Sequence, residues 1–420
     1  MDRRTFLTLS TSGILSALTG CSIGAQGDSR FTSTTTEITQ SQTATSTETI
    51  QTQSPTPNQS SGGNQRSITS IADVDLPVPK SKLVRGANKD DIPAITEPVF
   101  SDDWSGLTIA FFDPYGDVKK NEPRLNPDDR VIGLEHKGIA RAYPLRVLNW
   151  HEIVNDTFGG QPLMITYCPL CATGMAAKRM VNGEATIFGV SGFLWNSNLV
   201  MYDKLTKSYW SQAAATAIRG PKTGERLSLV PATLTTMNEW RKKHPETKVL
   251  LPPPKSGVIK NAWPAVFNYK RNPYEHYLSD DTIGIGENTL PEGDARLHPK
   301  TKVLGIRSEG VAKAYPFEAV QQTGVVNDTV GNLPVVVTVA PDETTLVAYD
   351  RRVDGSSLHF SKVSSNHLRG GGSRWKIVTG RAVDGPHQGT ALTPATNTPQ
   401  LFWFAWLDFN PDTAVYKPQT

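Results

Sequence analysis

Cys168 and Cys171 are the residues whose type and spacing could most directly support chemistry in this chain. They form a Cys-Pro-Leu-Cys motif, and Cys21 is the only other cysteine among the 420 residues. A Cys-x-x-Cys motif in a tight loop can aim both sulfurs at one metal ion, act as a redox dithiol, or close into a structural disulfide. The surrounding residues therefore decide which of these chemistries the sequence favours.

The first interpretation is a metal site. His151 could supply an imidazole as a third ligand, and Met175 could supply a thioether, although a methionine at a strand position is more often a core residue. Two thiolates with histidine and methionine suit copper, and two thiolates with histidine and an open position suit zinc. The sequence therefore predicts copper or zinc as the cofactor of such a site, and no other cofactor.

The second interpretation is a redox centre, with His151 as a proton carrier. A thioredoxin-like centre places its cysteines at the N-terminus of a helix, which lowers the pKa of the thiol. Here the residues after Cys171 have strand character and lead to the hairpin dipeptide Asn182-Gly183. The helical arrangement is therefore disfavoured.

The third interpretation is a disulfide that supports a binding surface, since an exported cysteine pair can simply close. The run from Gly192 to Lys207 would then bind a carbohydrate or another polar ligand, with an indole as a stacking platform and amide and carboxylate groups as hydrogen-bonding partners. The candidate ligand-binding residues are Trp195, Asn196, Asn198 and Asp203.

Other chemistries find no support. Ser191 lies in a segment that lacks the second glycine of a nucleophile elbow, and no glycine-rich phosphate loop, His-Glu-x-x-His motif or paired-carboxylate signature occurs. The formal net charge of +3 is close to balanced, so it gives no indication of a nucleic-acid partner.

The body of the chain contains an internal repeat, which predicts its domain organisation. We expect a first module at residues 124–250 and a second, degenerate module at residues 296–420, with an irregular segment at 67–123 and a connecting segment at 251–295. The recurring motifs are Val131-Ile132-Gly133-Leu134 with Val303-Leu304-Gly305-Ile306, Ala142-Tyr143-Pro144 with Ala314-Tyr315-Pro316, Val154-Asn155-Asp156-Thr157 with Val326-Asn327-Asp328-Thr329, Trp210 with Trp375, and Trp240 with Trp406.

The two copies differ at the residues that could do chemistry. The run from Gly192 to Lys207 is shortened in the second copy and replaced by a glycine-rich stretch. The framework residues recur in both copies, whereas the residues that could do chemistry are all replaced in the second. This predicts one active module and one that kept only the fold. The alternative is the loss of an old disulfide by drift. The replaced residues are Cys168 by Ala340, Cys171 by Glu343, His151 by Thr323, and Trp150 by Gln322.

Both copies predict the same elements, and hence an α+β fold of mostly antiparallel sheet with two short helices in each module. Asn182-Gly183 and Asp354-Gly355 are type I′ hairpin dipeptides between strand-like runs. The other expected elements are buried strands at 162–167 and 334–339, strands at 175–181 and 347–353, helices beginning near Pro144 and Pro316, and a helix around Trp240 that opens with a capping box formed by Thr236 and Glu239.

An export signal precedes the body. Arg3-Arg4 is a twin-arginine motif, and the stretch from Phe6 to Leu18 is too short and too rich in Ser and Thr to span a bilayer. Small residues then precede Cys21, as lipoprotein processing requires. Residues 1–21 are therefore predicted to be a twin-arginine lipoprotein signal with a lipidated Cys21.

Residues 22–66 consist largely of Ser, Thr, Gln, Pro and Gly. Such a segment cannot bury enough apolar surface to offset its ordering entropy, so it is predicted to be a disordered linker. We expect the protein at the cell surface or in a periplasm-equivalent space, anchored to the membrane by the lipid on Cys21. An extracytoplasmic protein or small molecule would be its further partner.

Several motifs resemble the domain of unknown function 3179 family. They are 148–156, 166–171, 188–192 and 196–203, and they cover much of the first module. The resemblance implies an exported or membrane-associated prokaryotic protein without an established activity. The family's signature falls on the residues that the repeat singles out. We therefore expect a metal or redox site at Cys168, Cys171 and His151, with a polar-ligand-binding protein as the alternative.

Overall fold

The computed structural model describes residues 76–113, 115–259, 267–285, 294–396 and 399–418. The predicted signal, the predicted lipidation site Cys21 and the predicted linker at 22–66 lie outside the described residues. Within these ranges, every helix is too short or too polar to cross a membrane.

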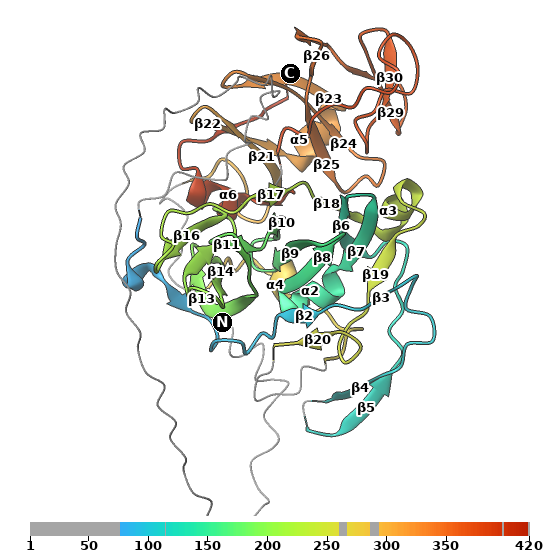
Figure 1. Cartoon of the computed structure of the whole chain (residues 1–420). Helices are drawn as coiled ribbons and strands as arrows, with labels where there is room; N and C mark the ends of the chain where they lie inside the picture. Colours follow the sequence, from blue (N-terminus) through green and yellow to red (C-terminus); the bar gives the residue numbers. More distant parts are fainter. Residues whose placement is uncertain (1–75, 114, 260–266, 286–293, 397–398, 419–420) are drawn as a thin grey trace, which may run out of the picture. The chain divides into compact units, whose positions relative to one another are not determined.

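The described chain is made of sheets, mostly antiparallel, with a few short helices, which is the expected α+β class (Figure 1). The first module begins with a hairpin, and a short helix leads from it into three antiparallel strands. These elements are β6 (Arg130–His136), β7 (Ile139–Pro144), α2 (Leu145–His151), β8 (Ile153–Phe158), β9 (Gln161–Cys168) and β10 (Thr173–Lys178).

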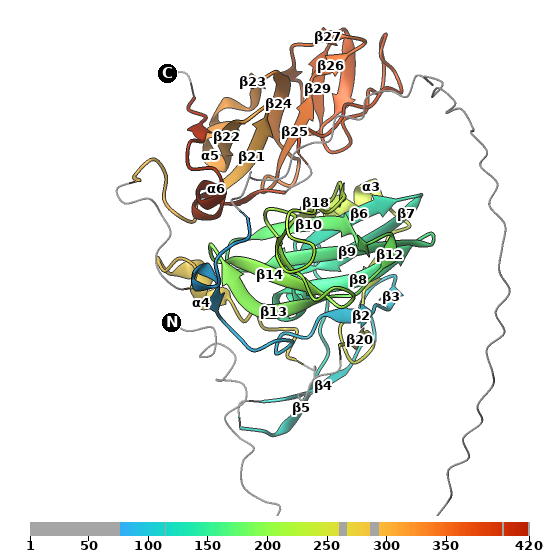
Figure 2. The same cartoon turned by 60° about the vertical axis from the view of Figure 1, so that its left-hand side comes forward.

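The same order and the same antiparallel pairings occur again later in the chain (Figure 2). Pro144 and Pro316 each directly precede the short helix, as the two copies of the sequence predict. The later elements are β21 (Lys302–Ser308), β22 (Val311–Pro316), α5 (Phe317–Thr323), β23 (Val325–Val330), β24 (Leu333–Val339) and β25 (Leu346–Asp350).

The ends of the two copies also correspond. In each, one edge of the opening hairpin receives an antiparallel strand and the other edge a parallel strand. The sheet orders are β18-β6-β7-β19-β3, in which β3 is Phe100–Ser101, and β31-β21-β22-β32. The added strands are β18 (Thr233–Thr236), β19 (Lys248–Leu250), β31 (Leu401–Phe402) and β32 (Ala414–Val415).

Both predicted type I′ hairpins are confirmed. Asn182 and Gly183 have φ of 55° and 78°, and Asp354 and Gly355 have φ of 49° and 80°. Positive φ at both turn residues is what this turn requires. The turns join β11 (Met180–Val181) to β12 (Glu184–Ala185) and β26 (Arg352–Val353) to β27 (Ser356–Ser357).

A second pair of helices, α3 (Met237–Lys243) and α6 (Trp403–Phe409), packs on the opening hairpins. Thr236 caps α3 by accepting a hydrogen bond from the amide of Glu239 at 3.3 Å, as expected. Trp240 and Trp406 lie so close to β6 and β21 that any Cβ at the facing glycines would overlap the indole rings. In both helices the indole N–H donates to a threonine hydroxyl at 2.8 Å.

The segment at 67–123 was expected to be irregular, but much of it adds short strands to the first module. The connecting segment likewise forms a strand and a helix, β20 (Gly257–Val258) and α4 (Glu275–Ser279). Strands of two to four residues are too short to show a periodic sequence pattern. The N-terminal strands are β1 (Val84–Arg85) beside β13 (Phe188–Trp195), β2 (Ile95–Glu97) beside β8, β3 (Phe100–Ser101) beside β19, and the hairpin of β4 (Ile109–Phe112) with β5 (Val118–Asn121).

The remaining strands of the first module form the sheet that faces the two cysteines, in the order β1-β13-β14-β15-β16. Its residues share one hydrophobic core with Cys168, Cys171 and α6. The strands are β13 (Phe188–Trp195), β14 (Asn198–Asp203), β15 (Tyr209–Ser211) and β16 (Thr216–Arg219), while β17 (Leu229–Val230) pairs with β10. In the second module the smaller sheet of β28 (Ser361–Lys362), β29 (His367–Gly370) and β30 (Ser373–Lys376) follows the hairpin of β26 and β27.

Candidate dithiol site

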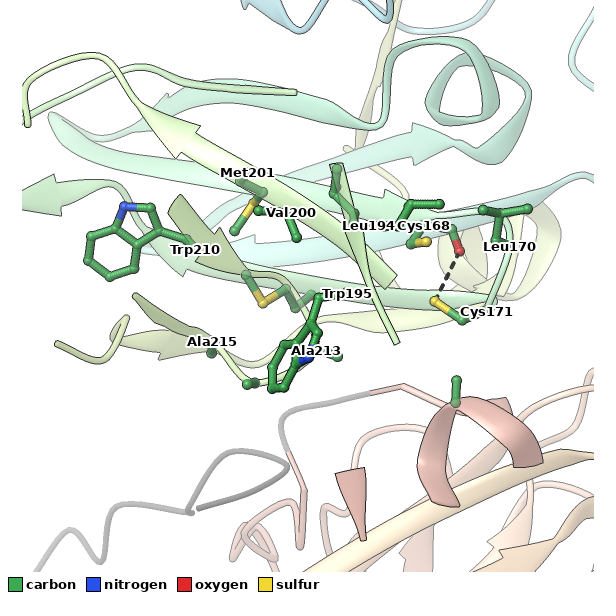
Figure 3. Packing of buried hydrophobic residues seen from close by; sticks show 14 of the residues in the cluster. Cys168, Leu170, Cys171, Leu194, Trp195, Val200, Met201, Trp210, Ala213 and Ala215 are labelled. Atoms are coloured by element: carbon green, nitrogen blue, oxygen red, sulfur yellow. Dashed lines mark hydrogen bonds between the residues drawn. The ribbon is translucent and has the colours of Figure 1, made fainter. Parts of the chain in front are cut away.

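The two cysteines lie in the short loop between β9 and β10. Cys168 ends β9 and is the partner of Thr173, the first residue of β10. Both cysteines are fully buried, and both are thiols rather than halves of a disulfide (Figure 3). A strand follows Cys171, so the motif lies in a hairpin loop and not at a helix N-terminus, as the sequence indicated.

Cys171 is the member of the pair that contacts a buried polar network. Its Sγ lies 2.9 Å from Thr173 Oγ1 and accepts a hydrogen bond from Asn198 Nδ2 at 3.1 Å. Asn198 Nδ2 also contacts Gln212 Oε1 at 2.8 Å, and the hydroxyl of Thr173 donates to the same oxygen at 2.8 Å. All of these side chains are almost completely buried, so each polar atom depends on the others for its hydrogen bonds.

The backbone fixes the orientation of both carboxamides. Asn198 Oδ1 accepts from the amide of Ala213 at 2.9 Å, which turns its NH₂ group toward the sulfur. Gln212 Nε2 donates to Thr166 Oγ1 at 3.1 Å and to the carbonyl of Thr173 at 3.0 Å, which turns its oxygen toward Asn198. The donor character of the group that faces Cys171 is therefore set by the surrounding chain.

These contacts change the acidity of Cys171. Burial by itself raises the pKa of the thiol, but hydrogen bonds from Cys168, Thr173 and Asn198 outweigh burial and lower the pKa below the usual value for cysteine. The pKa of Cys171 is thus lowered without a helix N-terminus.

The other cysteine has a different environment. The Sγ of Cys168 donates toward the carbonyl of Ser197 at 3.9 Å. Cys171 has a contact of the same kind, since its Sγ lies 3.9 Å from the carbonyl oxygen of Cys168. The two sulfurs therefore differ in that the side chains of Asn198 and Thr173 contact Cys171.

Two other parts of the chain hold the loop in place. The hydroxyl of Tyr277, from α4, donates to the carbonyl of Leu170 at 2.7 Å. The amide of Phe402, at the end of β31 in the second module, donates to the carbonyl of Cys171 at 3.0 Å. Both contacts reach the loop backbone, which fixes its conformation independently of the thiols.

His151 is not brought together with the cysteines. It ends α2, and its ring contacts Phe267 and Tyr269, which belong to a different hydrophobic cluster from the one that holds the thiols. Its Nδ1 lies 2.7 Å from the carbonyl of Pro93 and its Nε2 lies 2.8 Å from the hydroxyl of Tyr269. Burial lowers the pKa of His151 to about 4, so the ring is neutral at pH 7.

A three-ligand metal set of the predicted kind is not present in the described ranges, where no three His, Cys, Asp or Glu side chains are grouped to hold an ion. Met175, the weaker ligand candidate, is buried in the same core as the thiols. It pairs with Thr166, two residues along the strands from the pair formed by Cys168 and Thr173. Met175 and Cys168 therefore lie on the same face of the sheet.

The predicted ligand-binding run is mostly a tight hairpin. Residues 196 and 197 form its two-residue turn, with φ of 50° and 55°. Trp195 is buried, and its ring packs edge-to-face against Phe409 with 5.1 Å between the ring centroids, while Asn196 Nδ2 donates to the carbonyl of Asp408 at 3.3 Å. The indole that was expected to be a stacking platform therefore packs against α6.

Asp203 has a structural role in the same sheet. Its buried carboxylate accepts hydrogen bonds from the Trp210 indole at 2.9 Å and from the Ser208 amide at 3.2 Å. Of the four residues predicted to bind a ligand, only Asn198 therefore contacts the thiol site.

Comparison with known proteins agrees with the resemblance in the sequence. A family model described as "Protein of unknown function (DUF3179)" matches residues 89–413. The chain belongs to this family. Neither the curated proteins nor the solved structures that were compared with it give a significant match.

Three buried residues of this DUF3179 protein that sequence reasoning missed lie at or near the site. Gln212 could have been found from the sequence. It lies two residues after Trp210, and the residue two after the matching Trp375 is Ile377. Thr173 could not have been found in this way, because the second module keeps a threonine there, Thr345.

Glu152 was also detectable. It is fully buried at a φ of 56°, and its backbone carbonyl accepts from the amide of Tyr167, next to Cys168. The second module has Gly324 at this position, with a φ of 80°. A glycine adopts this backbone conformation with little strain, whereas glutamate does not.

Proposed function

We propose that this DUF3179 protein is a lipid-anchored extracytoplasmic protein whose first module exchanges thiols for disulfides through Cys168 and Cys171. One observation carries the proposal: two buried thiols share a hairpin loop, and a dedicated polar network donates hydrogen bonds to one of them. A thiolate is the species that attacks a disulfide, so hydrogen bonds that lower the pKa of Cys171 serve this reaction.

The proposed reaction is balanced by a partner that carries a disulfide. One cysteine sulfur attacks the partner disulfide, the partner S–S bond breaks, and one partner sulfur leaves as a thiolate. The second cysteine then attacks the mixed disulfide, and its proton passes to the leaving thiolate. Cys168 and Cys171 end as a disulfide, and the partner ends as a dithiol.

The rest of the predicted organisation belongs to this proposal. The repeated element order and the repeated edge strands support two tandem modules, of which only the first has the thiols. The twin-arginine motif and Cys21 support export and lipid anchoring, and the composition of residues 22–66 supports a flexible tether. A partner would then be an extracytoplasmic protein, in a compartment where disulfides persist.

A second candidate function is binding of a soft metal ion, and the position of Met175 on the same sheet face as Cys168 favours it. Two thiolates with a thioether suit copper(I) better than zinc, because zinc usually takes four nitrogen, sulfur or oxygen ligands. His151 would not take part without losing its contacts to Pro93 and Tyr269.

The test is a redox titration of the purified full-length protein combined with its metal content. We expect the thiols of Cys168 and Cys171 to disappear together in glutathione buffers, with a midpoint in the range of roughly −180 to −300 mV. Replacing either one with serine (Cys168→Ser or Cys171→Ser) should abolish the reversible step.

The matched control is Ser211→Ala, which changes a buried side chain of the facing sheet outside the loop and leaves both thiols. A pair that cannot be oxidised reversibly would contradict the proposal. One equivalent of copper that protects both thiols until it is removed would favour the second candidate instead.

A further inference from the structure

We propose that Cys171, and not Cys168, is the sulfur that attacks the partner disulfide, and that Asn198 and Gln212 are the positioning residues that select it. The inference rests on the proposed function. It goes beyond that function by assigning different roles to the two cysteines and by naming residues that act through one of them.

The hydrogen-bonding groups around the two sulfurs carry the inference. Cys171 faces the amide NH₂ of Asn198 and the hydroxyl of Thr173, both of which can donate to an anionic sulfur. Each sulfur also lies 3.9 Å from a carbonyl oxygen, Cys168 from that of Ser197 and Cys171 from that of Cys168. The amide and hydroxyl donors at Cys171 therefore favour negative charge on the second sulfur of the motif.

The network can accommodate both states of Cys171. With a proton on the sulfur, the thiol donates to Thr173 Oγ1 and the threonine hydroxyl donates to Gln212 Oε1. After the proton leaves, the same hydroxyl turns toward the sulfur, and Asn198 Nδ2 continues to donate to Gln212 Oε1. No buried polar atom of the network loses all its partners in either state, so the network tolerates the change of charge. Attack on a partner disulfide additionally requires the fully buried sulfur of Cys171 to become accessible.

The carboxamides hold this arrangement because rigid elements position them. Asn198 begins β14 and Gln212 directly follows β15. The backbone amide of Ala213 and the hydroxyl of Thr166 fix which end of each carboxamide faces the thiol. A donor that cannot rotate away stabilises the developing thiolate without reorganisation.

The second module keeps the threonine of the thiol site but does not keep the groups around it. Thr345 occupies the position of Thr173, but its hydroxyl contacts Asp342 and donates to the carbonyl of Leu234 at 3.0 Å. Ile377 occupies the position of Gln212. The carboxamides are therefore specific to the module that has the thiols.

The assigned roles define the order of bond formation. The thiolate of Cys171 attacks one sulfur of a partner disulfide, so that a mixed disulfide forms on Cys171 and the other partner sulfur leaves. Cys168 then attacks the Cys171 sulfur, and the proton of Cys168 passes to the departing partner thiolate. The products are the internal disulfide and a reduced partner.

The test uses full-length proteins that keep one cysteine of the loop, Cys168→Ser and Cys171→Ser. Each is treated with oxidised glutathione at pH 7, and the mixed disulfide is followed by mass spectrometry. We expect Cys171 in the first variant to react about tenfold faster than Cys168 in the second. Adding Asn198→Ala should slow the reaction of Cys171 about tenfold and leave the rate of Cys168 unchanged.

The rate of Cys168 is the internal control, because general damage to the fold would change both rates. Asn149→Ala is the matched control variant, since its amide contacts Asn272 outside the thiol network. Equal rates for the two cysteines, or equal effects of Asn198→Ala on both, would overturn the inference while the proposed function stands. If neither single-cysteine protein forms a mixed disulfide and the wild-type pair does not cycle, the proposed function itself fails, and the inference fails with it.

Discussion

In the first module the loop between β9 and β10 carries two thiols, whereas the matching loop of the second module, between β24 and β25, carries Ala340 and Glu343. The second loop makes a contact with the first module instead. Asp342 accepts from the hydroxyl of Thr235 at 2.9 Å, and Thr345 donates to the carbonyl of Leu234. The thiols are therefore confined to the loop of the first module, whereas side chains of the second loop contact β18.

The contacts between the two loops and the neighbouring strands are reciprocal. The loop of the first module accepts a hydrogen bond from Phe402 at the end of β31, and the loop of the second module contacts β18. β18 and β31 occupy the same position in the two sheets. Each of the two loops therefore contacts the corresponding edge strand of the other sheet.

The framework residues, by contrast, make the same hydrogen bonds in both modules. Asn155 accepts from the Phe188 amide at 2.7 Å, and its counterpart Asn327 accepts from the Phe360 amide at 2.8 Å. The next residue in each copy is an aspartate that binds the hydroxyl of a tyrosine on the opening hairpin. The shared motif is therefore architectural, and the difference between the modules is confined to the loop, the end of the first helix and the facing sheet.

The largest expected difference is the sensitivity of the first module to acid through His151. Its folded-state pKa of about 4 lies below the value of about 6.5 in an unfolded chain, so only the unfolded chain takes up a proton between these values. The free energy of unfolding should have its full value above pH 6.5 and should fall by about 3 kcal/mol as the pH drops to 4.

Urea denaturation at several pH values checks this, with His151→Gln removing most of the loss. The matching residue of the second module, Thr323, gives the control Thr323→Val, which should keep the pH dependence of the wild type. An unchanged pH dependence in His151→Gln would contradict the assignment.

A smaller and equal effect is expected where the two modules are alike. Gly133→Ala and Gly305→Ala should each lower the free energy of unfolding by about 1–3 kcal/mol, because the added methyl overlaps the indole of Trp240 or Trp406. Chemical denaturation of each variant measures the loss. Combining Gly133→Ala with Trp240→Phe should recover part of it, since the smaller ring leaves room for the methyl group. A loss in only one module would break the proposed equivalence of their frameworks.

The smallest effect concerns the residue that ends the first helix of each module. Glu152→Gly should be more stable than Glu152→Ala by about 1 kcal/mol, because both variants lack the carboxylate and only alanine is strained at positive φ. Gly324→Ala should lose a similar amount. Thermal unfolding compares the variants. If the glycine and alanine variants at position 152 were equally stable, the backbone there would be free of strain.

The elements with strong local signals were predictable from the sequence. The dipeptides Asn182-Gly183 and Asp354-Gly355 predict type I′ turns because few other residues tolerate two successive positive φ values. Thr236 predicts a helix start for a similar local reason. The two-residue strands of the N-terminal segment were not predictable, because they form only where a longer strand is already available for pairing.

The candidate site was predictable only in part. Cys168, Cys171 and Asn198 were found from their residue types and from their loss in the second copy. His151 has the right type for a ligand, but the helix that it ends turns the ring toward Pro93 and Tyr269. His151 and the two cysteines are all replaced in the second copy, but His151 does not lie beside the cysteines in the structure.

The sequence by itself determined the family, the α+β class, the repeated motifs and the candidate thiol pair, because each depends on residue types at short or constant spacing. The tertiary structure decided which groups surround the thiols. Asn198 reaches Cys171 from a different sheet and donates to Gln212, and Phe402 reaches the Cys171 carbonyl from the other module. Such contacts depend on how sheets pack on one another, and packing arises from many weak interactions that no local sequence pattern records.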